Sequence, residues 1–130
     1  MPQKILMVDD DPLMHRLYKH HLDRAGYQMI SAMNGREALD VADREQPNLI
    51  IMDVMMAEMD GITAVKELRK MESTKQIPVI VFTANANAYD TVKNESEFAG
   101  ADVFMTKPMS PAQMVAEVKR LLPKEPQEGK

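Results

Sequence analysis

Five short runs of mostly apolar residues recur along the chain, separated by longer stretches in which apolar and polar residues mix. Four of the five runs are almost entirely apolar rather than alternating, which is typical of strands covered on both faces, as in a parallel sheet. The runs are residues 5–8, 28–32, 49–52, 79–82 and 103–105. Because such strands need a layer on each side, this pattern limits the fold more than any other feature.

The stretches between the runs have the periodicity and the end signals of amphipathic helices. They are residues 11–26, 34–46, 60–73, 87–100 and 110–122, and the fourth is the most polar. In the first, Asp11 is expected to cap the helix, Pro12 to take the first helical position and Gly26 to end it. Ser110 and Pro111 are expected to start the last helix in the same way.

Each of four helices is expected to turn one apolar face toward the sheet. The expected inward residues are Leu13, Met14 and Leu17; Ala38, Val41 and Ala42; Ile62, Val65 and Leu68; and Met114, Val118 and Leu121. Strands alternating with helices predict a doubly wound α/β domain with five parallel strands, five helices and right-handed crossovers. The domain is expected to span residues 4–122, and the polar residues 123–130 to form a tail or the start of a linker.

Composition narrows the classes of protein. The 130 residues suit one domain, and the absence of cysteine excludes a disulfide framework or a thiolate zinc site. With 16 Lys and Arg against 20 Asp and Glu, the net charge of −4 argues against a nucleic-acid surface. No apolar run reaches the roughly 20 residues of a membrane span, and the N-terminus lacks the layout of a signal peptide. A cytoplasmic setting without membrane contact is expected.

Polar side chains stand where the apolar runs end. Asp9 and Asp10 follow the first run, Asp53 ends the third, Thr83 ends the fourth, and Lys107 follows the fifth. Ligands of open α/β sheets bind at the carboxyl ends of the strands. Carboxylates gathered there repel one another unless a cation lies among them, and Mg²⁺ prefers such oxygen ligands. Acids, metal, lysine and hydroxyl together indicate a phosphoryl-transfer site in which a carboxylate can be the nucleophile.

Four segments carry a specific resemblance: "ILMVDDD", "LIIMDVMMAEMDG", "VIVFTA" and "VFMTKP". In order and spacing, the chain resembles the receiver domain of two-component response regulators, of the chemotaxis-regulator-like type. Each motif alone is weak, but the four together are specific. The resemblance implies a flavodoxin-like sheet with the strand order 2-1-3-4-5.

The resemblance also implies residue roles. Asp53 would be the phosphoacceptor, Asp10 would bind Mg²⁺ directly, and Asp9 would bind it directly or through water. The backbone carbonyl of Met55 would be a further metal ligand.

The resemblance assigns roles to four more residues, at the ends of the fourth and fifth strands. Thr83 and Lys107 would bind the phosphoryl oxygens, and Thr83 and Phe104 would be the switch residues. The peptide bond before Pro108 would be cis.

The partners implied are a histidine kinase or a histidine phosphotransfer protein as phosphoryl donor. Phosphorylation would change the surface of the fourth helix, fifth strand and fifth helix, and could drive dimerisation. The domain would not bind nucleic acid itself, would not be an enzyme in the ordinary sense, and could assist its own phosphorylation and dephosphorylation. The downstream partner is left open.

Two alternative functions remain. A phosphatase of the haloacid-dehalogenase type also uses Asp, Thr, Lys and Mg²⁺, but its nucleophile lies on the first strand and it needs an acid pair after the lysine. Past Lys107 the only acids are Glu117, Glu125 and Glu128. A receiver-like module that binds partners without phosphorylation usually lacks a site residue, and none is missing here.

Several residues near the site have simpler interpretations. Asp11 and Asp60 are expected to be helix caps rather than ligands. His15, His20 and His21 lack the i, i+4 spacing of a helical metal site and are expected at the surface. The 13 methionines are expected to serve mainly as adaptable core packing, with an exposed partner-binding patch as the alternative.

Overall fold

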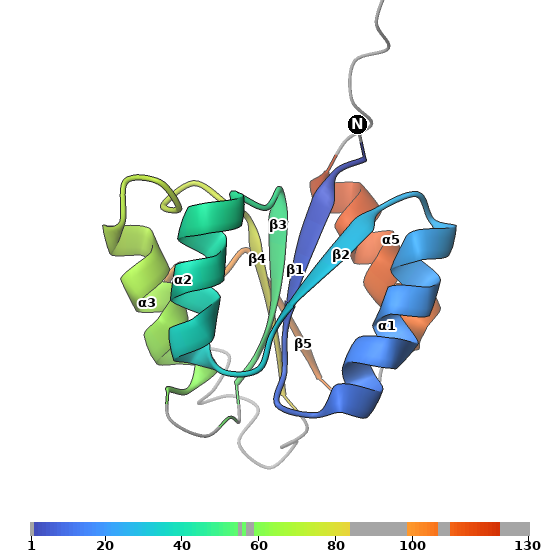
Figure 1. Ribbon diagram of the computed structural model, residues 1–130, viewed down its shortest axis with the longest axis horizontal. Coiled ribbons are helices and arrows are strands. Elements are labelled where there is room, and N and C mark those ends of the chain that lie inside the picture. Colours follow the sequence, from blue (N-terminus) through green and yellow to red (C-terminus); the bar gives the residue numbers. More distant parts are fainter. Residues whose placement is uncertain (1, 55, 57–58, 84–98, 107–109, 123–130) are drawn as a thin grey trace, which may run out of the picture.

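Five parallel strands form one sheet in the order β2-β1-β3-β4-β5, as the resemblance implied (Figure 1). The computed structural model describes residues 2–54, 56, 59–83, 99–106 and 110–122. The strands are β1 (Lys4–Val8), β2 (Gln28–Ala32), β3 (Leu49–Asp53), β4 (Val79–Thr83) and β5 (Val103–Thr106). All four neighbouring pairs are parallel, so the carboxyl ends of all five strands lie at one edge of the sheet.

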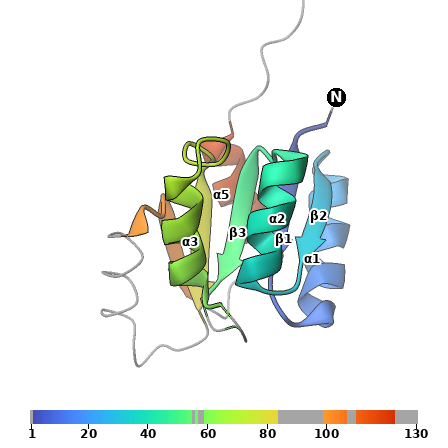
Figure 2. The same ribbon diagram turned by 60° about the vertical axis from the view of Figure 1, so that its left-hand side comes forward.

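Helices cover both faces of the sheet, which confirms the doubly wound architecture. They are α1 (Pro12–Arg24), α2 (Gly35–Glu45), α3 (Gly61–Lys70) and α5 (Pro111–Leu121). Figure 1 shows α2 and α3 on one face of the sheet and α1 and α5 on the other. Figure 2 shows α2 and α3 side by side in front of the sheet. The expected fourth helix lies almost entirely outside the described residues.

Two buried clusters follow from the alternation of side chains along each strand. On one face, residues such as Leu6, Ile50 and Val81 pack against α2 and α3. On the other, residues such as Met7 and Ile51 pack against α1 and α5. Every residue of β3 and β4 is buried, which explains why the sequence of these strands is apolar without alternation.

The predicted helix ends are confirmed. The Asp11 side chain accepts a hydrogen bond from the Leu13 N–H at 2.9 Å, and Pro12 is the first residue of α1. Gly26 follows α1 with a φ of +93°, a conformation that glycine adopts without strain. Ser110 and Gln113 form a reciprocal capping box at the start of α5.

The buried face of α1 differs from the prediction. Met14 packs partly buried against the cluster on this side, as expected, but Leu13 and Leu17 are 63% and 43% exposed. The helix buries His15, Tyr18 and Leu22 instead. Positions 15, 18 and 22 lie on one side of a helix. The rings of His15 and Tyr18 supply apolar area, and the two imidazole nitrogens of His15 lie within hydrogen-bond distance of the Asp9 carbonyl and the Ser31 hydroxyl, so burial of His15 carries little polar cost. The expectation that His15 lies at the surface was therefore wrong.

The buried faces of α2 and α3 match the prediction: Ala38, Val41, Ala42, Ile62, Val65 and Leu68 are all buried. In α5, Met114 and Val118 are buried in the cluster on the opposite face of the sheet, and Leu121 packs half-buried against that cluster.

Within the described part of the chain, no helix has the length and apolarity needed to cross a membrane.

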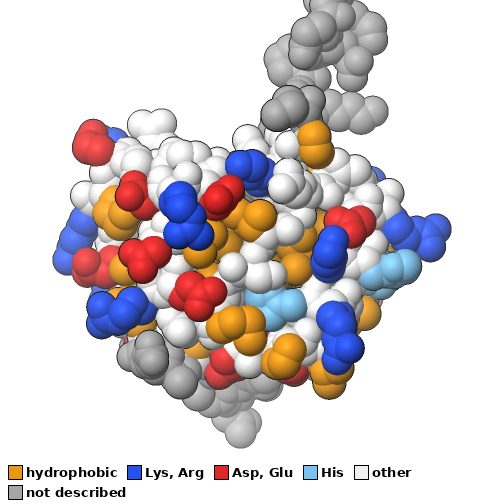
Figure 3. Space-filling view, in the orientation of Figure 1, with side chains coloured by type: hydrophobic (Ala, Val, Ile, Leu, Met, Phe, Trp, Pro, Cys, Tyr) orange, Lys and Arg blue, Asp and Glu red, His pale blue; other side chains and the backbone are white. Residues whose placement is uncertain are grey.

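Charges of both signs are mixed on the surface that Figure 3 shows. Over the described residues of α2 and α3 on this face, acidic and basic side chains alternate, and no broad basic patch gathers there. Binding to the phosphate backbone of a nucleic acid needs such a basic patch.

Candidate functional site

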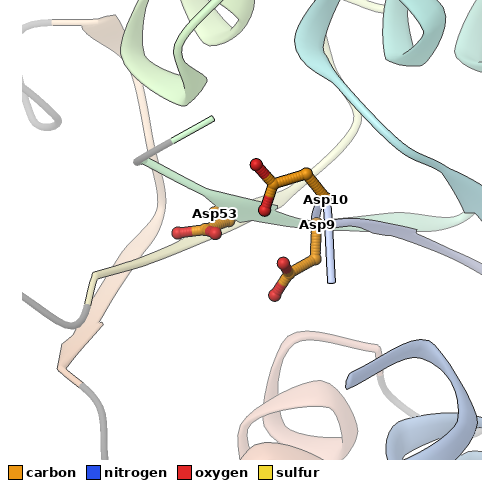
Figure 4. Close-up of side chains that lie close together, drawn as sticks. All are labelled: Asp9, Asp10 and Asp53. Atoms are coloured by element: carbon orange, nitrogen blue, oxygen red, sulfur yellow. The ribbon is translucent and has the colours of Figure 1, made fainter. Parts of the chain in front are cut away.

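The carboxyl ends of β1 and β3 bring three acids together. In the register of this pair Val8 lies opposite Met52. The residues that follow them, Asp9 and Asp53, therefore lie at the same level of the sheet. Carboxylate oxygens of Asp9, Asp10 and Asp53 all lie within 4.8 Å of one another. Figure 4 shows the three side chains gathered at this edge of the sheet.

Burial differs among the three acids. Asp9 and Asp53 are only 1% and 4% exposed, whereas Asp10 lies in contact with solvent. Carboxylates in this arrangement repel one another and are costly to bury without a compensating charge. A set of carboxylate oxygens without histidine or cysteine suits a hard divalent cation such as Mg²⁺, and the open side at Asp10 gives a path from solvent.

Local hydrogen bonds hold Asp9 in place. Its N–H donates to the Ala32 carbonyl at 3.2 Å, extending the pairing of β1 with β2. Its carboxylate accepts from the Asp11 N–H at 2.9 Å, and its carbonyl oxygen lies 2.6 Å from Nε2 of His15. Burial, and to a lesser extent the negative charge of Asp9, raises the pKa of the Tyr18 phenol above its usual value. The α1 helix therefore places the His15 ring in hydrogen-bond contact with Asp9, and the Tyr18 phenol where the charge of Asp9 affects it.

A glycine makes the position of Asp53 sterically possible. The Gly61 N–H donates to the Val54 carbonyl at 3.0 Å, and a Cβ atom at position 61 would overlap with the carbonyl oxygen of Asp53. The preceding residue, Asp60, caps α3 by accepting from the Thr63 N–H at 2.9 Å. Asp60 is thus a cap, as predicted.

The other predicted site residues are described only in part. Thr83 is fully buried at the end of β4, one residue beyond Phe82, which pairs with Asp53. Phe104 pairs with Val81 and is half-buried against the cluster on the α2 and α3 side. Lys107, Pro108 and the Met55 carbonyl lie outside the described residues.

One residue beside the site was missed in the sequence. His15 touches Asp9, yet the leucines around it directed the predicted apolar face elsewhere. The i, i+3, i+7 spacing of His15, Tyr18 and Leu22 was the available signal. It was hidden because histidine and tyrosine are less strongly associated with the interior than leucine.

Comparison with known proteins agrees with this geometry. Residues 5–119 match the response regulator receiver domain family. The chain is 41% identical over 122 residues to the alkaline phosphatase synthesis transcriptional regulatory protein PhoP of Bacillus subtilis, covering 94% of this chain and 49% of that protein. It therefore spans about half the length of the curated relatives it matches.

Solved structures show the same fold. The chemotaxis response regulator CheY4 of Vibrio cholerae superposes with a TM-score of 0.86 at 32% identity, over 94% of this chain and 100% of that one. The response regulator TrrA of Thermotoga maritima, solved in complex with Mg²⁺-BeF, gives a TM-score of 0.80 at 32% identity, over 92% and 99%. Since the family match covers residues 5–119 and the fold agrees over nearly the whole chain, the chain belongs to the response regulator receiver domain family of two-component signal transduction.

Proposed function

We propose that Asp53 accepts a phosphoryl group from a phosphohistidine of a histidine kinase or a histidine phosphotransfer protein. The observation that carries the proposal is the buried carboxylate of Asp53, held at a strand end within 4.8 Å of the Asp9 and Asp10 carboxylates. An Asp53 oxygen attacks phosphorus, the new O–P bond forms as the N–P bond breaks, and the electron pair returns to the donor imidazole. In the separate hydrolysis step, water attacks phosphorus, the O–P bond to Asp53 breaks, Asp53 leaves as a carboxylate and inorganic phosphate is released.

Asp9, Asp10 and Asp53 would hold Mg²⁺, together with the Met55 carbonyl. When bound, the ion would offset the negative charges of the acids and the phosphoryl group. Thr83 and Lys107 would bind phosphoryl oxygens, and the latter would add a positive charge. The solved Mg²⁺-BeF complex of TrrA supports this choice of cation.

A protein donor is supported by the surface of α1. Leu13 and Leu17, the two large hydrophobic side chains exposed in the described part of the chain, lie one turn apart on this helix. The helix begins two residues after Asp10, so this apolar pair lies near the acidic cluster. Exposed apolar side chains beside a reactive group are typical of protein contact sites.

The response would be a change in the surface formed by the fourth helix, β5 and α5, with Thr83 and Phe104 as the switch residues. Phosphorylation would shift the population toward this state, and dimerisation through the changed surface would follow where a partner copy recognises it. Cytoplasmic location and the absence of direct nucleic-acid binding remain part of this proposal.

The deciding experiment is labelling with acetyl phosphate and Mg²⁺, followed by mass spectrometry of the intact protein. The wild type should gain one phosphoryl mass, and Asp53→Asn should not, because the amide lacks the nucleophilic oxygen anion. Asp60→Asn is the matched control, since Asp60 caps α3. An unlabelled wild type would instead favour a module that binds partners without phosphorylation, and equal labelling of Asp53→Asn would place the phosphoryl group elsewhere.

A further inference from the structure

We propose that His15 is a positioning residue for the metal site, acting through the peptide bond that joins Asp9 and Asp10. The inference rests on the proposed function, because it assigns His15 a role in the Mg²⁺ site formed there. His15 contributes no ligand atom to the acidic cluster, and it lies on α1 rather than on a strand.

The geometry defines the hydrogen-bonding state of the ring. Nε2 of His15 lies 2.6 Å from the Asp9 carbonyl oxygen, and Nδ1 lies 3.1 Å from Oγ of Ser31. A carbonyl oxygen only accepts, so Nε2 carries the hydrogen. In the neutral ring Nδ1 is then an acceptor, and the Ser31 hydroxyl donates to it.

The contact with Asp9 controls more than one residue. The carbonyl oxygen of Asp9 belongs to the rigid peptide plane that runs from the Cα of Asp9 to the Cα of Asp10. The orientation of that plane sets the ψ angle of Asp9 and the φ angle of Asp10. One hydrogen bond from His15 therefore influences the direction of both carboxylates that β1 contributes to the cluster.

This support matters because the acids repel. Asp9, Asp10 and Asp53 place three carboxylates within 4.8 Å, so a free peptide plane would rotate to separate them. His15 is 7% exposed, and a hydrogen bond shielded from water in this way holds its geometry more firmly than an exposed one. The ring is held in turn by Ser31 of β2, so the plane is linked to a neighbouring strand as well as to α1.

The test measures Mg²⁺ affinity by NMR titration in His15→Leu, His15→Gln and His20→Leu. Leucine keeps apolar bulk but removes the N–H, and we expect Mg²⁺ binding to weaken roughly tenfold. Glutamine offers an amide N–H at a similar reach and should restore most of the affinity. His20 is exposed on the same helix, so the same substitution there should leave the affinity at the wild-type value.

Two readouts separate positioning from general stability. The carbonyl ¹³C shift of Asp9, measured without metal, should move in His15→Leu and return toward the wild-type value in His15→Gln. Leu22→Ala, which removes a buried side chain of α1 far from the acids in sequence, should lower the urea midpoint without weakening Mg²⁺ binding. Unchanged affinity in folded His15→Leu, or weakened affinity that glutamine does not restore, would overturn the inference.

If His15→Leu does not fold, a pair of amide variants carries the test. Asparagine is one methylene shorter than glutamine and cannot bring its N–H to the Asp9 carbonyl, so His15→Asn should bind Mg²⁺ more weakly than His15→Gln. Equal affinities would refute a role for the N–H. Asp10→Asn in an otherwise wild-type chain tests the metal site itself: if it binds Mg²⁺ as well as the wild type, the proposed function fails rather than the role of His15.

Discussion

Asp10 is the most exposed of the three clustered acids, and it can be changed without opening the core. Its carboxylate lies within 4.8 Å of the other two. Two negative charges at this separation repel each other by about 1 kcal/mol in a medium of high dielectric constant. Without Mg²⁺, Asp10→Asn should therefore raise the free energy of unfolding by about that amount.

With saturating Mg²⁺, the wild type should become more stable to unfolding than Asp10→Asn. An ion that binds only the folded state stabilises it, and the wild type should gain more than Asp10→Asn. Urea unfolding with chelator and with Mg²⁺ measures both quantities. An identical gain in the two proteins would show that Asp10 is not a ligand.

A glycine is required at position 61 because the backbone of Asp53 lies very close to it, and not because of an unusual φ angle. A methyl group there would overlap with the Asp53 carbonyl, so Gly61→Ala must displace the strand end that carries Asp53. We expect a loss of about 1–3 kcal/mol of unfolding free energy and weaker Mg²⁺ binding. Gly26→Ala is the matched control: its φ of +93° makes alanine cost about 1 kcal/mol, but open space surrounds the site and Mg²⁺ binding should not change. Wild-type Mg²⁺ affinity in Gly61→Ala would contradict the steric argument.

At the scale of the elements, Arg69 at the end of α3 joins the amino ends of β4 and β5. Its guanidinium donates to the carbonyls of Gly100 (2.7 Å), Ile77 (2.6 Å) and Lys75 (3.2 Å), and pairs with Asp102 at 3.1 Å. Only 21% of its side chain is exposed. The fork of five N–H donors satisfies several carbonyls at once, which a lysine cannot do.

Arg69→Lys should lower the free energy of unfolding by about 2 kcal/mol, because carbonyls at the strand ends lose their donors. Arg44→Lys is the control, since Arg44 lies 66% exposed on α2 and should change stability by less than about 0.5 kcal/mol. Chemical denaturation measures both. If the two variants are equally stable, the hydrogen bonds of Arg69 contribute little beyond a surface charge.

For the whole molecule, the two cores differ in one respect that affects how stability depends on pH. The core between the sheet and α1 and α5 contains Tyr18, whose pKa is raised by burial and, to a lesser extent, by Asp9. Because the folded protein holds this proton more tightly than the unfolded chain, the resulting stability is fully present below pH 10, the usual pKa of tyrosine. It is lost as pH rises through the folded pKa.

Over a pH range that spans the usual tyrosine pKa of about 10, the stability of the wild type should therefore fall above about pH 10, and more steeply than that of Tyr18→Phe. Tyr27, whose pKa is raised by burial alone, should give a smaller change when replaced by phenylalanine. Urea midpoints across this range measure the effect. Parallel pH profiles for wild type and Tyr18→Phe would show that the phenol of Tyr18 is not responsible.

Local features of the fold could be predicted because they depend on neighbours in the chain. The caps at Asp11, Asp60 and Ser110 involve hydrogen bonds to residues two or three positions away, so the pattern of a few residues was sufficient. The strands could be recognised for a related reason: full burial on both faces leaves a continuous apolar run.

The site needed more than local pattern. The apolar runs predicted which acids end the strands, but they did not give the order of the strands in the sheet. That β1 and β3 are neighbours was inferred from the resemblance to receiver domains. Only that order places Asp9 and Asp53 at one level, more than 40 positions apart in the chain.

The orientation of α1 was decided by tertiary structure alone. Leu13 and Leu17 make as good an apolar stripe as His15, Tyr18 and Leu22, and a helix cannot bury both. The choice depends on Ser31 of β2 and the Asp9 carbonyl, which meet the imidazole only after the sheet has formed. Hydrophobic periodicity carries no information about such distant polar partners, whereas the free energy of burial depends on them.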